Sequence, residues 1–168
     1  MADIKNHGPL KSVAGAKDDV FAAMEALFFA YRDFTREPDA ILAQYGFGRA
    51  HHRVLHFVFR RPGMTVAELL NILQITKQSL SRVLRQLIDD GFVEQVSQAP
   101  DRRRRLLYLT KAGEKLIGDL SDLQRARFEK AFEQAGPAAV SAYHQVMAAL
   151  MDGETRGDGE TRGREKSG

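Results

Sequence analysis

The chain contains no cysteine among its 168 residues. Disulfide bonds, thiolate metal sites and cysteine redox switches are therefore excluded. No apolar run approaches the roughly 18 residues that a membrane span needs. The first residues, MADIKNHGPLKSVAG, lack the apolar core of a secretory signal. We therefore expect a cytoplasmic protein with no membrane partner.

Motifs of catalysis are also missing. The sequence has no glycine-rich phosphate loop, no G-x-S-x-G elbow and no Cys/His pair. Its Asp and Glu residues are scattered, mostly on expected helix surfaces beside Lys or Arg. These observations predict a protein that is not an enzyme and that carries no cofactor.

The composition is that of a globular protein, with 43% hydrophobic and 28% charged residues. We expect one domain over residues 17–151, preceded by a flexible arm over residues 1–16. The tail, 152–168, repeats GETRG, has no apolar residue and is expected to be disordered. The net charge is only +3, so the placement of charge matters more than its sum.

Apolar residues recur at spacings of three and four over residues 18–34, which predicts an amphipathic first helix. Pro38 is expected to end this helix or to restart the chain as a short helical turn. RAHHRVLHFVFRR (49–61) predicts a second helix, which Pro62-Gly63 should stop.

Thr65 and Glu68 form a capping box at the start of TVAELLNIL, the expected third helix. Thr76 is placed to cap a fourth helix, KQSLSRVLRQLIDDG. After Gly91 the apolar period changes, and FVEQV and RLLYL predict a β-hairpin. Two further helices follow, one over about 110–134 and one from Pro137.

Two short helices followed by a hairpin predict a winged helix-turn-helix over about 48–110, in a mainly α (α+β) fold. The second of the two helices, 76–90, would lie in the DNA major groove. Polar side chains that suit base and phosphate contacts lie on or beside its face away from the core. The candidate DNA contacts on this helix are Thr76, Lys77, Gln78, Ser79, Ser81, Arg82 and Arg85, with Gln86 flanking them.

The hairpin tip carries four consecutive arginines, Arg102, Arg103, Arg104 and Arg105. A narrow minor groove attracts arginine through its enhanced negative potential. We expect Arg102 and Arg103 to lead into DNA, and Arg104 or Arg105 to contact phosphate or to support the hairpin. Asp101 would be repelled by DNA unless it is paired, so we expect it to hold an arginine in position.

Six residues of the wing fit the pattern D-x-R…L-x-LT-x-x-G, namely Asp101, Arg103, Leu107, Leu109, Thr110 and Gly113. With this pattern the wing resembles that of the MarR family of transcriptional regulators. The order of elements fits from about residue 18 to residue 151, and Thr76 to Leu87 is similar to the family's recognition helix. The resemblance implies that Asp101 orients a wing arginine and that Arg103 enters the minor groove.

The resemblance further implies a homodimer that binds a pseudo-palindromic operator in double-stranded DNA. Its dimerisation helices would be about 18–35 and 111–151. Members of the family are usually repressors released by a small molecule, often an aromatic acid or a phenol. The helices themselves support the dimer, because they are too apolar for a thin monomer and a two-fold dimer would bury them.

His52 and His56 are four residues apart on one expected helix face, with His51 adjacent. This spacing can bind zinc if a third ligand comes from elsewhere, for example His144, Asp33 or Glu37. The alternatives are that the histidines pack under the dimer helices or line an effector pocket, for which the candidates are Phe28, Tyr31, His52 and His56.

Three functions are compared. The first is a ligand-released dimeric repressor. The second is a metal-responsive regulator that uses His52 and His56. The third is a winged helix that binds proteins and not duplex DNA. The arginine wing favours DNA binding, which should weaken steeply as the salt concentration rises.

Overall fold

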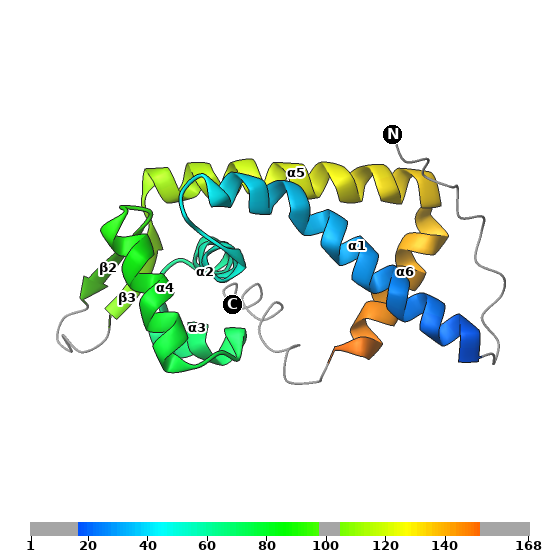
Figure 1. The fold of residues 1–168 in the computed structure, drawn as a ribbon, viewed down its shortest axis with the longest axis horizontal. Helices are drawn as coiled ribbons and strands as arrows, with labels where there is room; N and C mark the ends of the chain where they lie inside the picture. Colours follow the sequence, from blue (N-terminus) through cyan, green and yellow to red (C-terminus); the bar gives the residue numbers. More distant parts are fainter. Residues whose placement is uncertain (1–16, 98–104, 152–168) are drawn as a thin grey trace, which may run out of the picture.

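A computed structural model describes residues 17–97 and 105–151. In these ranges the chain is mostly helical, with one small antiparallel sheet, as the sequence predicts (Figure 1). The elements are α1 (Lys17–Ala43), α2 (Arg49–Arg60), β1 (Met64–Thr65), α3 (Val66–Leu73), α4 (Lys77–Asp89), β2 (Val93–Ser97), β3 (Arg105–Leu109), α5 (Lys111–Ala135) and α6 (Pro137–Leu150). None of the helices in these ranges is long and apolar enough to cross a membrane.

The prediction that Pro38 ends the first helix is wrong, because α1 continues through it to Ala43. A proline inside a helix removes one backbone hydrogen bond and bends the axis. Thr35, Pro38 and Leu42 are all buried, so a buried stripe continues across the proline. Packing along α5 therefore outweighs the local cost, and the second half of α1 runs beside α5 (Figure 1).

The core lies in the winged-helix lobe, where α2, α3, α4, the sheet and the first half of α5 meet. Leu80, Leu84 and Leu87 anchor α4 in this core, as their helical spacing predicts. Completely or almost completely buried apolar side chains fill it, namely Leu42, Phe47, Val54, Leu55, Val58, Met64, Leu69, Leu80, Leu84, Leu87, Val93, Leu107, Leu116, Ile117 and Leu120.

The sheet has the strand order β1-β3-β2, and both pairings are antiparallel. The hairpin of β2 and β3 pairs Val93 with Leu109 and Gln95 with Leu107. β1 was not predicted, because two residues are too few to show an alternating pattern. It forms after the Pro62-Gly63 turn, where the Gly63 N–H donates to the carbonyl oxygen of Leu107 at 2.8 Å.

The long helices α1, α5 and α6 form an extended arm beyond the winged helix (Figure 1). Within this arm the Phe34 ring meets the Phe128 ring edge-on at 5.4 Å, and Arg127 pairs with Glu37 at 3.1 Å. Most of the apolar side chains on the first half of α1 nevertheless remain exposed. For example, Met24 is 61% exposed and Leu27 is 53% exposed in the single chain.

Candidate nucleic-acid interface

A three-residue turn, Gln74 to Thr76, joins α3 to α4. Gln74 is in the left-handed region with φ 50°, and its side-chain amide donates to the carbonyl oxygen of Asn71 at 2.6 Å. The Thr76 hydroxyl accepts from the Ser79 N–H at 3.2 Å and donates to the Ser79 hydroxyl at 2.9 Å. The side chains of Thr76 and Ser79 are therefore occupied in capping α4, and they fix the start of this helix.

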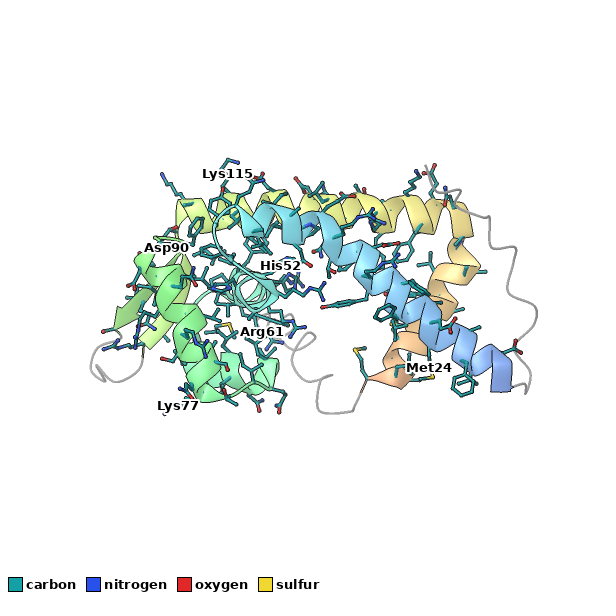
Figure 2. The ribbon with its side chains drawn as sticks, viewed as in Figure 1. Met24, His52, Arg61, Lys77, Asp90 and Lys115 are labelled. Carbon is teal, nitrogen blue, oxygen red and sulfur yellow. The ribbon has the colours of Figure 1, made fainter. Side chains whose placement is uncertain are left out.

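The face of α4 opposite the core is polar and exposed. Lys77 lies at the end of α4 that is farthest from α5 in Figure 2. Two guanidinium groups, those of Arg82 and Arg85, follow along the helix. The exposed members of the predicted DNA-contact set on this helix are Thr76, Lys77, Gln78, Ser81, Arg82 and Arg85, while Ser79 is half-buried.

Gln86 does not belong to this polar face. Its side-chain oxygen lies 3.0 Å from His51 Nε2 on α2, and the residue is half-buried. The sequence placed Gln86 beside the DNA-contact residues because it adjoins Arg85. The structure turns its side chain toward α2 instead.

A shallow groove of about 400 Å³ separates α4 from the hairpin. Its lining carries three positive charges, from Lys77, Arg85 and Arg105, and one negative charge, from Asp89. Arg105 Nη1 donates to Gln95 Oε1 at 3.2 Å, so Arg105 braces the two strands of the hairpin. A groove with this charge suits a phosphate backbone that passes between the helix and the wing.

The wing tip, residues 98–104, lies outside the described residues. The predictions for Asp101, Arg102, Arg103 and Arg104 therefore stay predictions.

The base of the wing is fixed by two hydrogen bonds of Thr110. Its hydroxyl donates to the carbonyl oxygen of Gly91 at 2.6 Å, and its N–H donates to the carbonyl oxygen of Phe92 at 3.1 Å. The same hydroxyl accepts from the Gly113 N–H at 3.2 Å and so caps α5. The threonine and the glycine of the LT-x-x-G motif thus tie the end of α4, the hairpin and α5 together.

Two of the candidate effector residues, Tyr31 and His52, lie where α1 faces α2. Arg49 Nε donates to Asp39 Oδ2 at 2.9 Å and its guanidinium lies over the Tyr31 ring, while Arg53 Nη2 approaches the Tyr31 hydroxyl at 3.4 Å. The other carboxylate oxygen of Asp39 is buried without a hydrogen-bond partner among the described residues. Tyr31 therefore reaches α2, whereas Phe28 is exposed and contacts the ring of Phe29.

His52 and His56 share one side of α2, and Figure 2 shows His52 on the side that faces α1. Within the described residues, no group of three His, Asp or Glu side chains is placed to hold a metal ion. His144, one of the suggested third ligands, instead lies against Phe132 and Tyr143. The part of the chain that is described therefore gives the metal-responsive alternative no support.

Burial lowers the pKa of both imidazoles below the ordinary value of 6.5. The charge of His56 lowers the pKa of His52 further. A histidine whose pKa is lowered in the folded state binds a proton more readily in the unfolded state. It therefore lowers the stability of the fold as the pH decreases below about 6.5.

We expect the midpoint of thermal unfolding to decrease between about pH 7 and about pH 5. The decrease should be smaller in His52→Gln, which removes one of the two histidines with a lowered pKa. The measurement is thermal unfolding followed by circular dichroism across this pH range. Equal pH dependence in the variant and the wild type would show that His52 does not contribute.

Comparison with known proteins agrees with this architecture. The family model described as MarR family matches residues 45–104. The HTH-type transcriptional regulator PetP of Rhodobacter capsulatus is 54% identical over 129 residues, which cover 77% of this chain and 78% of PetP.

Solved structures share the fold. A crystal structure of a MarR family transcription regulator has 25% identity and a TM-score of 0.68, and covers 79% of this chain and 88% of that one. NadR in complex with 4-hydroxyphenylacetate has 23% identity and a TM-score of 0.60, with coverage of 84% and 96%. An S. aureus MepR variant bound to an oligodeoxyribonucleotide has 17% identity and a TM-score of 0.54, with coverage of 82% and 96%.

The winged helix, the LT-x-x-G wing base and the high identity to PetP over three quarters of both chains support one conclusion. The chain belongs to the MarR family and is a DNA-binding transcriptional regulator, not an enzyme.

Proposed function

We propose that the chain is a homodimeric repressor that binds a pseudo-palindromic operator and is released by a small-molecule effector. One observation carries the proposal: the chain exposes a basic helix face at one end and a large apolar face at the other. The basic face suits DNA, and the apolar face suits a second copy of the chain.

Two helices of the arm, α1 and α6, each expose large apolar side chains. Large apolar side chains on these helices are one third to two thirds exposed in the single chain, namely Val20, Phe21, Met24, Leu27, Phe28, Phe29, Tyr31, Tyr143, Val146 and Leu150. An exposed patch of this kind on a water-facing surface marks an interaction site. In a two-fold dimer the same patches meet, and the two α4 helices can read half-sites about one turn of DNA apart.

On DNA, α4 would enter the major groove with Lys77, Gln78, Arg82 and Arg85 toward the bases and phosphates. The arginine wing would reach the flanking minor groove. Asp101 would hold Arg103 in position, as the resemblance to the family implies.

For effector release, the junction of α1 and α2 is the proposed site. It combines aromatic rings with two guanidinium groups, Arg49 and Arg53, within reach of the Tyr31 hydroxyl. An aromatic or phenolic effector with a carboxylate fits this chemistry, and the structural relative NadR has been solved with 4-hydroxyphenylacetate. Phe28, Tyr31, His52 and His56 remain the proposed pocket residues.

Selection of binding sites from random duplex DNA with the purified protein tests this function. We expect an inverted repeat to be recovered. Absence of enrichment would favour the protein-interaction alternative, and repetition with zinc would test the metal-responsive one.

Arg103→Ala is expected to weaken binding to the selected duplex roughly tenfold or more while the dimer persists. Arg82→Ala should instead change the sequence preference as well as the affinity. Arg125→Ala is a control for the loss of one charge, since Arg125 is exposed on α5 and its ion pairs with described residues, Asp122 and Glu129, lie along its own helix. The measurement is fluorescence anisotropy with labelled duplex, and unchanged affinity in Arg103→Ala would contradict the wing assignment.

A further inference from the structure

His51 connects the start of α2 to the last turn of α4. Its ring stacks on Phe47 with centroids 4.8 Å apart and an interplanar angle of 9°. Its Nδ1 accepts from the Gly48 N–H at 3.1 Å, and its Nε2 lies 3.0 Å from Gln86 Oε1. The Gln86 amide nitrogen in turn approaches the carbonyl oxygen of Gly46 at 3.5 Å.

Each contact in this series pairs one hydrogen-bond donor with one acceptor. Because Nδ1 accepts a hydrogen bond, the proton of the neutral ring lies on Nε2 and is donated to Gln86 Oε1. The amide nitrogen of Gln86 then faces the carbonyl oxygen of Gly46. This chain of hydrogen bonds therefore begins at Gly48 and ends at Gly46, both in the short connection between α1 and α2. Gln86 of α4 lies between His51 and Gly46.

The local sequence explains why a histidine occupies this position. Gly48 is the N-cap of α2 and has no side chain to satisfy the first free N–H groups of that helix. His51, at the third position of the helix, reaches back to the Gly48 N–H as a Glu or Gln does in a capping box. Unlike a carboxylate, the imidazole then has a second nitrogen that can donate to another helix.

Gln86 is well placed to fix the orientation of α4 relative to α2 and to the α1–α2 connection. It follows Arg85 directly and lies one helical turn after Arg82, and both arginines are exposed. The apolar contacts of Leu80, Leu84 and Leu87 bury one side of α4 but have no strict direction. A hydrogen bond is directional, so the contact with His51 sets the orientation of α4 that the apolar core leaves adjustable.

We propose that His51 is a positioning residue that holds the recognition helix α4 at a fixed angle to the dimerisation helix α1. It does so through Gln86 and the Gly46–Gly48 connection. In the dimer, this angle sets the distance between the two α4 helices and hence the half-site spacing that the protein prefers. The inference rests on the proposed dimeric function and assigns to His51 a role separate from that of His52 and His56.

Three duplexes test the role: the selected inverted repeat, and versions with one base pair added or removed between the half-sites. His51→Phe keeps a ring on Phe47 but loses both hydrogen bonds, and Gln86→Leu removes the partner on α4. Each variant should reduce the discrimination between spacings roughly three- to tenfold, as the loss of a net hydrogen bond implies. The double variant should lose no more than either single variant, since both break the same link.

His51→Gln should restore the spacing preference, because glutamine offers an acceptor to the Gly48 N–H and a donor to Gln86. Circular dichroism and mass measurement establish that each variant is a folded dimer. If His51→Phe fails to fold, Gln86→Leu and His51→Gln decide the result. A wild-type protein that is indifferent to spacing would contradict the dimeric function itself. If the wild type discriminates between the spacings and the folded variants do so equally well, the role of His51 is wrong while the dimeric function stands.

Discussion

Gly113→Ala is expected to destabilise the protein by roughly 3 kcal/mol, the upper end of the usual cost of overpacking. A Cβ atom at this position would overlap the carbonyl oxygen of Phe92. That oxygen cannot withdraw easily, because it accepts from the Thr110 N–H at 3.1 Å. Relief of the clash would separate α5 from the base of the wing.

Gly118→Ala is the matched control in the same helix. Among the described residues, and apart from its chain neighbours and the nearby backbone of α5, a Cβ atom at Gly118 would meet no atom within 4 Å. Alanine is favoured over glycine inside a helix, so this variant should be more stable than the wild type by about 0.5–1 kcal/mol. Chemical denaturation of both variants measures the difference. Equal stabilities would contradict the close packing of α5 against Phe92.

Leu27→Glu is expected to weaken the proposed dimer by about 100-fold or more, and to weaken binding to the proposed operator with it. Leu27 is 53% exposed in the single chain and lies on the apolar face of α1 with Met24 and Tyr31. Burying a large apolar side chain contributes about 1.5–3 kcal/mol. In a two-fold interface the substitution occurs twice, and each copy also places an unpaired carboxylate in an apolar contact.

Ala26→Glu is the control for added charge. Ala26 is exposed on the same helix, about 100° around the axis from Leu27. Sedimentation analysis over a range of protein concentrations compares the two variants with the wild type. If Leu27→Glu remains as dimeric as Ala26→Glu, α1 does not form the interface.

Much of the fold could be predicted from the sequence because its signals are local. The caps at Thr65, Thr76 and Thr110 mark the helix starts that the structure has. RLLYL, residues 105–109, coincides with β3. These signals depend on residues a few positions apart, and so does the wing pattern that indicates the family.

Other features depend on contacts between distant residues. The continuation of α1 through Pro38 results from packing on α5, which no local pattern shows. The sequence places Gln86 beside the DNA-contact residues, but in the structure it pairs with His51, 35 positions earlier in the chain. The apolar residues of α1 recur at helical spacing, but most of those on its first half are exposed in the single chain. In the proposed dimer a second copy of the chain would cover them.

The binding of the selected inverted repeat at several salt concentrations, with the stoichiometry determined in the same titrations, tests the central claim most directly. We predict two chains per duplex and an affinity that falls by about 1000-fold or more between about 50 and 200 mM salt, as expected for six or more phosphate contacts. One chain per duplex, or an affinity almost independent of salt, would contradict a dimer that reads DNA through α4 and the arginine wing.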